Sequence, residues 1–337
     1  MRRAFIFLVF LLAQSTGEIK RIKNRFQFKK SCSRLLAEGR SGICGGHYDP
    51  VNYEKGNINL IFAVPHDGAL KPYKINDRSQ GCMDEWGKCR YGDRYQMDKC
   101  EIKDKQCTVA NMADTHTQKI AKLVRNEFIR LTGKTPHLVI NNLYRAKMDP
   151  NRLKDEAAQG NEEAEFAFEE YHNKIKYAKH LFDDQPGLLI DFHGQAHETE
   201  ITEIGYLVRK KELIDSDIPK ELSIRNLVGN SVKEYKEYLF GQKSLGRLFN
   251  MKNYRAVPSP NSKAPGKNDQ YFRGGYSIKQ HGSDDGEGKV DAIQLEFPKR
   301  LRFNSGLRKK LSKDLADILN TFFSTNYEKQ RMEIEDL

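Results

Sequence analysis

Two short apolar runs stand out in the pattern of hydrophobic and polar positions along the chain. Leu188–Phe192 ends at His193-Gly194, and Ile58–Val64 ends at Pro65-His66. Apolar runs of this length, bounded by glycine or proline, are typical of buried strands rather than helices. Because open α/β sheets place their functional groups at the carboxyl ends of strands, we expect both histidines at one edge of an α/β sheet. Two unrelated loop histidines are the alternative.

The periodicity between and after these runs predicts alternating helices and strands. Asp114–Leu131 has apolar residues at helical spacing and is followed by Gly133, a common helix stop. A strand over His137–Asn141 follows, and the order strand, helix, strand favours parallel pairing. The further predicted elements are a helix over 161–182, a strand over 204–208, two or three short helices within 213–250, a strand over 292–297 and a final helix capped by Ser305.

Three stretches lack regular periodicity and are predicted to be loops. Residues 18–57 are basic and rich in glycine and are expected on the outside of the domain. Residues 67–113 form a Cys-rich insertion directly after the first of the two histidines, so we expect it to cover the site. Loops this long are usually functional or cross-linked. Residues 257–288 are predicted to be a flexible loop beside the site, with Tyr276 and His281 as candidate substrate contacts.

Residues 1–17 have the layout of a secretory signal peptide. Arg2-Arg3 precedes the apolar run Ala4–Ala13, and small residues follow it. The run is too short to span a membrane comfortably, and no later stretch is long and apolar enough to do so. We therefore expect residues 18–337 to form a single domain of a secreted or secretory-pathway luminal protein without a stable membrane span, and we expect a monomer.

Six cysteines lie in the first third of the chain. An even number of cysteines in an exported protein predicts disulfides. Pairing by proximity gives Cys32–Cys44, Cys82–Cys89 and Cys100–Cys107, although spacing alone does not fix the connectivity. The alternative is a structural zinc site built from the last four cysteines, which the uneven spacing and the export signal disfavour.

The formal net charge is +11 at pH 7. Such a charge could favour anionic substrates or polyanionic surfaces, but the lysines are scattered from end to end, which indicates an ordinary solvated surface. No motif that interleaves basic and aromatic residues stands out, so we expect no nucleic-acid partner. A polyanion-binding protein is an alternative that the charge permits.

The residues that flank the predicted strands fit the requirements of a mononuclear zinc hydrolase. Such a site needs three ligands and an open position for water, a carboxylate base and a fixed positive charge. His66 and His193 offer two nitrogen ligands, and Asp114 is the preferred third ligand because a helix start between two strand ends can face the site. The alternative role of Asp114 is to cap that helix. The other acidic residues that spacing leaves open as third ligands are Asp84, Glu85 and Asp67.

Glu296 is the candidate general base. A carboxylate near the end of an apolar strand is costly to bury without a purpose, and the alternative is a rim residue paired with Lys299 or Arg300. His197 is placed as a substrate contact, because the glycine that follows the second histidine argues for a loop rather than for a helical pair of histidines.

Arg145 and Arg152 bracket Asp149-Pro150-Asn151. Arginine grips a carboxylate through two parallel hydrogen bonds, and the alternative is a salt bridge in a surface loop. Asp149 could orient a ligating histidine by accepting its second ring N–H, or it could only form a turn before the proline. Asp191, two residues before the second histidine, is assigned the same supporting role.

Taken together, these stretches resemble the N-formylglutamate amidohydrolase family. The similarity runs in family order from about residue 58 to residue 300. The matching stretches are Val64-Pro65-His66-Asp67-Gly68, Asp114-Thr115, Tyr144–Arg152, Asp191-Phe192-His193-Gly194 and Ile293-Gln294-Leu295-Glu296. The resemblance implies a fold similar to that of zinc carboxypeptidases, which is a three-layer α/β/α arrangement with a mixed, mostly parallel central sheet and one catalytic Zn²⁺.

In zinc carboxypeptidases an Asp-x-Asn-Arg run binds the substrate carboxylate, and its Asp supports a zinc-ligating histidine. Asp149, Asn151 and Arg152 match that run, and Glu296 resembles the base on a late strand. Carboxypeptidases also place a ligand Glu three residues after the first histidine, where this chain has Ala69. This departure disfavours a standard carboxypeptidase, and the Cys-rich insertion goes beyond the short bacterial pattern.

The resemblance implies a secreted, zinc-dependent amidohydrolase that acts on a small molecule or peptide bearing a carboxylate. The two histidines and Asp114 would hold Zn²⁺, Glu296 would take the proton of the attacking water, and Arg145 would stabilise the oxyanion. Asn151 and Arg152 would hold the substrate carboxylate. The alternatives are a secreted peptidase or peptidoglycan amidase on the same fold, and a catalytically inactive secreted binding protein, which the missing ligand Glu favours.

Overall fold

The computed structural model describes residues 49–92, 107–214, 218–284 and 288–328. The predicted signal peptide and the expected Cys32–Cys44 pair lie outside these residues. Within them, no helix has the length and apolar character needed to cross a membrane. Pro50–Leu337 forms one compact unit.

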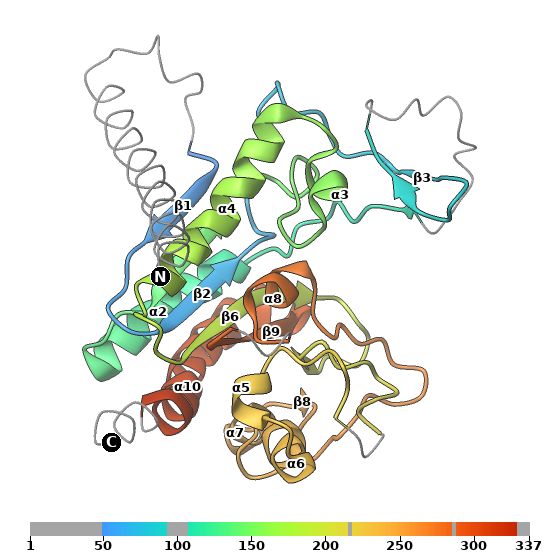
Figure 1. The fold of residues 1–337 in the computed structure, drawn as a ribbon. Coiled ribbons are helices and arrows are strands. Elements are labelled where there is room, and N and C mark those ends of the chain that lie inside the picture. The colour runs from blue at the N-terminus through green and yellow to red at the C-terminus, as the bar shows by residue number, and fades with distance from the viewer. Residues whose placement is uncertain (1–48, 93–106, 215–217, 285–287, 329–337) are drawn as a thin grey trace, which may run out of the picture. The chain divides into compact units, whose positions relative to one another are not determined.

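A seven-stranded mixed sheet is the centre of this unit (Figure 1). Its strands in spatial order are β1 (Val51–Glu54), β5 (His137–Asn141), β2 (Leu60–Val64), β6 (Gly187–Gln195), β9 (Val290–Pro298), β7 (Thr202–Gly205) and β8 (Ala256–Val257). Strands β5, β2, β6 and β9 are parallel to one another, whereas β1 pairs antiparallel with β5 and β7 pairs antiparallel with β9. The predicted α/β class with a mixed, mostly parallel sheet is therefore confirmed.

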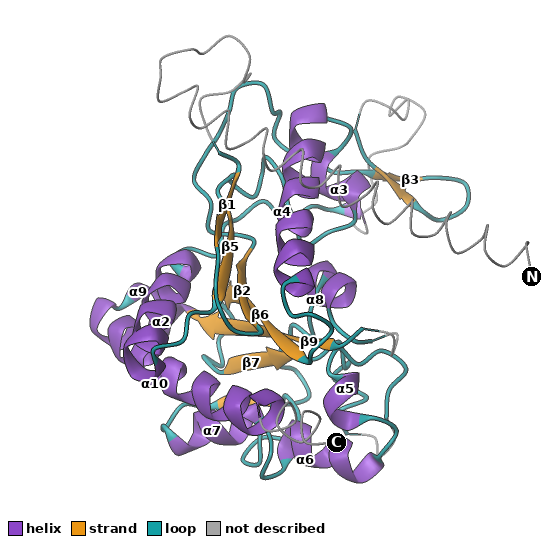
Figure 2. Cartoon of the chain, turned by 60° about the vertical axis from the view of Figure 1, so that its left-hand side comes forward, coloured by secondary structure: helices purple, strands orange, loops and turns teal. Residues whose placement is uncertain are grey.

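Helices cover both faces of the sheet and make three layers (Figure 2). On one face, α2 (Thr117–Thr132) and α10 (Ser305–Phe323) pack against strand residues such as Phe62 and Phe192. On the other face, α4 (Glu162–His180) and α8 (Tyr276–His281) pack against alternate residues of the same strands, such as Ala63 and Leu189. Successive strand side chains point to opposite faces, so one apolar run supplies both layers. The other helices in the described residues are α3 (Lys154–Ala158), α5 (Arg225–Val228), α6 (Val232–Phe240), α7 (Leu245–Met251) and α9 (Lys299–Phe303), with a π-helical turn at Ser324–Glu328.

Helix α2 begins at Thr117, three residues after the predicted start at Asp114. Its first N–H groups are capped from outside the helix. The Asp67 carboxylate accepts hydrogen bonds from the backbone N–H groups of His116 and Gln118, at 3.1 and 2.8 Å. Helix N-termini leave such donors without intrahelical partners. Because Asp67 satisfies them, Asp114 is not the cap and its carboxylate can face the sheet edge.

Two other helix ends test the predicted stops and caps. Gly133 ends α2 in the left-handed conformation, with φ 70°, as predicted. The cap of α10 is Asn304, whose side chain accepts a hydrogen bond from the Leu307 N–H at 3.0 Å, and not Ser305. Both residue types are good caps, so the pattern alone does not choose between them.

Two strand ends differ from the prediction. Strand β6 continues to Gln195, so His193 lies within the strand rather than after it. Strand β7 ends at Gly205 instead of residue 208. Leu207 has a left-handed backbone conformation, with φ 68°, which takes the chain out of the extended form.

Two segments predicted to be loops contain regular structure. Strand β1 lies within 18–57, and helix α8 lies within 257–288. The first turn of α8 has a distant partner, because Oδ1 of Asn151 accepts a hydrogen bond from the Ser277 N–H at 2.8 Å. The loop prediction for Tyr276–His281 is wrong because the residue that supports this helix start is remote in sequence.

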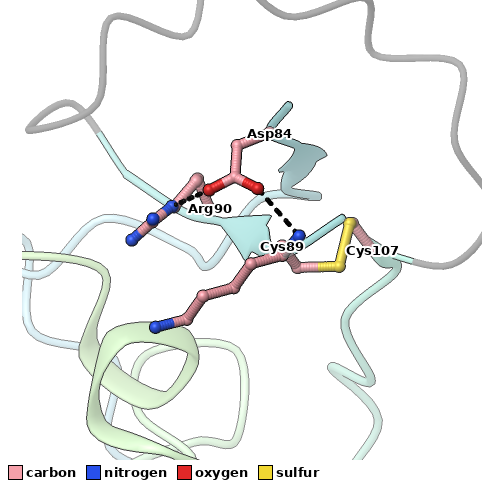
Figure 3. Close-up of a disulfide and its surroundings, with 5 residues drawn as sticks. Asp84, Cys89, Arg90 and Cys107 are labelled. Carbon is pink, nitrogen blue, oxygen red and sulfur yellow. Dashed lines mark hydrogen bonds and ion pairs between the residues drawn. A yellow bond between two sulfur atoms is a disulfide. The ribbon is translucent and has the colours of Figure 1, made fainter. Parts of the chain in front are cut away.

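Part of the Cys-rich insertion is a small hairpin of β3 (Cys82–Met83) and β4 (Cys89–Arg90). Cys89 is disulfide-bonded to Cys107 (Figure 3), and Cys82 is also disulfide-bonded. The proximity pairs Cys82–Cys89 and Cys100–Cys107 are therefore wrong, as is the four-cysteine zinc site. In the hairpin register Cys82 lies opposite Arg90 and Cys89 lies opposite Met83, so the two cysteines point to opposite faces.

The hairpin turn accounts for two of the alternative third ligands. The Asp84 carboxylate accepts hydrogen bonds from the N–H groups of Trp86 and Lys88, and it pairs with Nε of Arg90 at 2.6 Å (Figure 3). Glu85 is exposed in the same turn. Asp84 therefore stabilises the hairpin turn, and Glu85 lies at its surface.

A buried carboxylate in β9 makes a pH-dependent contribution to stability. Asp291 is fully buried and accepts hydrogen bonds from the hydroxyls of Ser283 and Tyr327 and from the N–H of Asn226. Burial raises the pKa of Asp291 to about 7, above the value of about 3.9 expected for the unfolded chain. The folded state therefore holds this proton more tightly. Protonated Asp291 stabilises the folded state fully below about pH 4, and this contribution is lost as the pH rises to about 7.

Asp291→Asn should remove this pH dependence. We expect the free energy of unfolding of the variant, relative to wild type, to increase from about pH 5 to about pH 8 in urea titrations. Asp155→Asn, at an exposed position, is the control and should follow the wild-type profile. Parallel profiles for wild type and Asp291→Asn would contradict this assignment.

Candidate metal centre

A row of polar side chains crosses the sheet at the carboxyl ends of its parallel strands. Strands β6 and β9 pair so that Asp191 lies beside Gln294 and His193 lies beside Glu296. Strand β7 continues the row, because Glu203 lies beside Glu296. The intervening apolar residues face the α2 and α10 layer, so these polar side chains share the opposite face. Strand register therefore places chemically active groups next to one another.

His66, Asp114 and His193 converge at this edge, and together they could hold a metal ion. Their potential ligand atoms all lie within 4.8 Å of one another, and the three side chains are buried. Oδ2 of Asp114 lies 3.2 Å from Nδ1 of His66 and 3.0 Å from Nδ1 of His193. In the described part of the chain, no other group of three such residues converges in this way.

Two further carboxylates orient the imidazoles. Oδ1 of Asp149 lies 2.7 Å from Nε2 of His66, and Oδ2 of Asp191 lies 3.0 Å from Nε2 of His193. A carboxylate that accepts from Nε2–H keeps the proton on that nitrogen. The lone pair of each Nδ1 then points toward Asp114, where a shared cation would sit.

The electrostatics of the trio His66, Asp114 and His193 favour a positive charge between the three side chains. Burial opposes ionisation of Asp114, but when the imidazoles carry a second proton, on Nδ1, the charge of His66 and the hydrogen bonds from both rings outweigh burial and lower the pKa of Asp114. Burial also opposes a charge on His193, but Asp191, followed by Asp114, raises the pKa of His193 to about 10. Carboxylates that hold a proton on an imidazole this strongly also attract a metal cation to the same place.

Asp149 is itself held by arginines. Its Oδ2 lies 2.9 Å from Nε of Arg145 and 3.3 Å from Nη2 of Arg78, and its Oδ1 accepts a hydrogen bond from the Asn151 N–H at 2.9 Å. Arg145 also reaches toward the trio, with Nη1 3.5 Å from Oδ1 of Asp114. The sequence did not identify Arg78, because it lies in the irregular insertion and belongs to no motif.

Glu296 is buried beside the trio. Its Oε1 accepts a hydrogen bond from Nε2 of Gln294 at 2.9 Å and lies 3.9 Å from Nδ1 of His193. Its Oε2 has no hydrogen-bond partner among the described residues. Burial raises the pKa of Glu296 to about 8. Only 4% of the residue is exposed, which argues against a rim residue paired with Lys299 or Arg300.

The two predicted carboxylate-binding residues occupy different positions. Asn151 is buried, with Nδ2 3.3 Å from Nε2 of His193 and 3.4 Å from Oε1 of Gln294. Arg152 is partly exposed and pairs through Nε with Oε1 of Glu156 at 3.2 Å. Asn151 therefore donates to Gln294 and packs beside a candidate ligand, whereas Arg152 lies where a solute can reach it.

His197 lies at the β7 side of the row. Its Nδ1 is 2.6 Å from Oε1 of Glu203, and its ring packs against that of Phe272, with 4.7 Å between ring centroids. The N–H of Phe272 donates to the other oxygen of Glu203 at 2.7 Å. Glu203 therefore orients His197, a relation that the sequence did not reveal because the partner is on the next strand.

Tyr276 and His281 lie on α8. The Tyr276 hydroxyl donates to Oε1 of Gln280 at 3.1 Å, and its ring packs edge-on to His172. His281 is buried, with Nε2 2.8 Å from Nδ1 of His172, whose Nε2 lies 3.0 Å from the carbonyl oxygen of Pro150. This position suits support of the 149–152 loop from behind rather than direct contact with a solute.

Neither family models nor curated proteins match this chain. Solved structures are similar to it at low sequence identity. An N-formylglutamate amidohydrolase from Ralstonia eutropha is 12% identical, with a TM-score of 0.49 over 84% of this chain and 100% of that one. A gene product of Agrobacterium tumefaciens is 12% identical, with a TM-score of 0.46 over 82% and 94%. A bacteriophage poly-gamma-glutamate hydrolase is 13% identical, with a TM-score of 0.35 over 87% and 96%.

The similar structures thus include a member of the family that the sequence motifs resemble. At these identities and TM-scores, the similarity assigns neither a substrate nor an activity to this chain. What the chain can do follows from its own side chains.

The trio predicts a metal site that depends on each histidine. His66→Ala should lower the affinity for Zn²⁺ by more than about 100-fold, beyond the range typical of changes to supporting residues. Competition with a chromophoric chelator measures this affinity. His180→Ala, at an exposed position on α4, is the matched control. Wild-type affinity in His66→Ala would remove this imidazole from the site.

Proposed function

We propose that this protein is a zinc-dependent hydrolase that cleaves an amide or peptide bond in a carboxylate-bearing substrate. One observation supports this above others. A buried His66–Asp114–His193 trio lies beside Glu296, whose Oε2 has no hydrogen-bond partner among the described residues. A metal site next to an available carboxylate is the arrangement that activates water for attack on a carbonyl.

The donor set supports Zn²⁺ as the ion. Two imidazole nitrogens and one carboxylate oxygen are ligands that catalytic zinc takes from proteins, with a fourth position left for water or substrate. The convergence of both Nδ1 atoms on one oxygen of Asp114 fits this ion. When bound, Zn²⁺ supplies Lewis acidity, which lowers the pKa of water and polarises a carbonyl.

Glu296 is the proton acceptor in this proposal. Its unpartnered Oε2 can accept the proton of an attacking water and then deliver that proton to the departing amine nitrogen. Gln294 holds Oε1 at 2.9 Å and so fixes the orientation of the carboxylate. A pKa raised by burial to about 8 suits a group that must both take and release a proton near neutral pH.

The arginines divide two further tasks. Arg145 is anchored through Nε to Asp149 and reaches within 3.5 Å of Asp114, so its charge can stabilise the developing oxyanion. Arg152 is about one-third exposed and pairs only with Glu156 among acidic side chains of the described residues. We assign it to the substrate carboxylate together with Asn151, whose Nδ2 lies 3.3 Å from Nε2 of His193. His197 would contact the substrate from the β7 side, and Tyr276 would border the site from α8.

The proposal includes export. A disulfide between Cys89 and Cys107 is typical of oxidising compartments, and it agrees with the signal-like pattern of residues 1–17. We therefore place the protein in the secretory pathway or outside the cell, acting as a monomer on a small molecule or peptide.

Glu296→Gln should separate catalysis from metal binding. We expect hydrolysis of N-acyl amino acids and short peptides to fall by about 10²–10⁴-fold, the usual contribution of a general base, while zinc content stays at the wild-type level. Glu127→Gln, on the outer surface of α2, is the control and should keep both. Undiminished hydrolysis by Glu296→Gln would exclude this residue as the base.

Arg152→Met should remove the preference for a free carboxylate. We expect kcat/KM for carboxylate substrates to fall by about 10- to 100-fold, because a hydrogen bond to a charged group is worth about 1.5–3 kcal/mol. The matched substrates with an amidated carboxyl group should be hydrolysed as by wild type. An equal loss on both substrate series would contradict a role in carboxylate recognition.

A further inference from the structure

Arg78 is a buried cation from the Cys-rich insertion that lies next to the metal centre. Only 3% of the residue is exposed. Its guanidinium donates to four acceptors: Nε to the Arg145 carbonyl at 3.0 Å, Nη1 to the Glu156 carbonyl at 3.4 Å, and Nη2 to the Ala110 carbonyl at 2.5 Å and to Oδ2 of Asp149 at 3.3 Å. An arginine with donors fixed in three directions has little rotational freedom.

The contact with Asp149 connects Arg78 to a candidate ligand. The two oxygens of Asp149 are divided: Oδ2 faces Arg78 and Arg145, and Oδ1 lies 2.7 Å from Nε2 of His66. Asp149 is fully buried, and a buried carboxylate requires nearby positive charge to stay ionised. Arg78 therefore helps keep Asp149 charged and in the orientation that keeps the Nδ1 lone pair of His66 on the centre.

The segment that follows Cys107 holds Arg78 from the other side. The Arg78 carbonyl accepts a hydrogen bond from Nδ2 of Asn111 at 3.0 Å, and the Gly81 N–H donates to the Cys107 carbonyl at 2.9 Å. The Cys89–Cys107 disulfide joins this segment covalently to the hairpin (Figure 3). The disulfide thus links the two stretches that enclose Arg78, residues 78–90 and 107–112, covalently to each other.

We infer that Arg78 is a positioning residue of the metal centre, and that the Cys89–Cys107 disulfide raises zinc affinity by holding Arg78 against Asp149. This inference rests on the proposed zinc site. It makes the insertion part of the centre rather than a peripheral cover. It also makes metal affinity sensitive to redox state, because reduction of this disulfide removes the covalent link between the two stretches around Arg78.

Zinc affinity of the folded protein tests the inference, measured with a competing chromophoric chelator. Arg78→Met should weaken Zn²⁺ binding by about 10- to 100-fold, the range seen when a partner of a ligating side chain is lost. Arg78→Lys keeps the positive charge but not the planar guanidinium with its several donors, so it should lose less zinc affinity than Arg78→Met. Arg90→Met is the matched control, because Arg90 lies in the same insertion and pairs with Asp84, and it should bind as wild type does.

The disulfide is tested without touching Arg78. The Cys89→Ser/Cys107→Ser double variant should bind Zn²⁺ more weakly than wild type, by about 3- to 10-fold, which is below the effect of losing the arginine. Combining this pair with Arg78→Met should add little, because both changes act through one contact. If Arg78→Met fails to fold, the zinc affinities of Arg78→Lys and of the Cys89→Ser/Cys107→Ser double variant test the inference instead.

Cobalt spectroscopy separates positioning from general destabilisation. Co²⁺ bound in place of Zn²⁺ reports ligand geometry through its visible d–d bands. A shifted spectrum in Arg78→Lys and in the cysteine pair would support the inference. Wild-type affinity and an unchanged spectrum in both variants would overturn it and leave the zinc site standing. Absence of Zn²⁺ binding by wild type would instead overturn the proposed function, and this inference with it.

Discussion

One carboxylate oxygen, Oδ2 of Asp114, lies against two buried imidazoles, and the rest of the site is arranged around that contact. Removing a carboxylate from water is costly unless positive charge or strong donors replace its hydration. Asp114 has His66, His193 and the Gly194 N–H within 3.2 Å. This cluster lies at a sheet edge, where strand ends bring distant residues together without long side chains.

The cost of burying a carboxylate also explains the charged groups around the trio. Asp149, Asp191 and Glu296 are also buried, and each lies beside a member of the trio. Asp149 has two arginines, Asp191 has an imidazole, and Glu296 has one amide donor and an unpartnered oxygen. Of these three carboxylates, Glu296 is the one with no imidazole or guanidinium nitrogen within hydrogen-bond distance among the described residues, so burial raises its pKa, and the proton-transfer role is assigned to it.

Much of the fold followed from local pattern. The two apolar runs form β2 and β6, which are neighbouring parallel strands of the mixed sheet, and the histidines that follow these runs lie within reach of a common partner. Asp114 was preferred from its place between predicted strand ends, and the structure puts it between the two imidazoles. These features are recoverable because hydrophobic period and strand order constrain which strand ends meet.

What the sequence did not reveal depends on contacts between distant residues. Asn151 supports the start of α8 from 126 positions away, and Arg78 reaches Asp149 from the insertion. The disulfide pairing failed for the same reason, because neighbouring cysteines in a hairpin can point to opposite faces. No local spacing encodes these partners; only the packed chain does.

The most direct measurement is anomalous diffraction at the zinc edge from crystals of the zinc-loaded protein. We expect one anomalous peak per chain, about 2.0–2.2 Å from Nδ1 of His66, Nδ1 of His193 and a carboxylate oxygen of Asp114. A peak elsewhere in the chain, or none at this sheet edge, would contradict it.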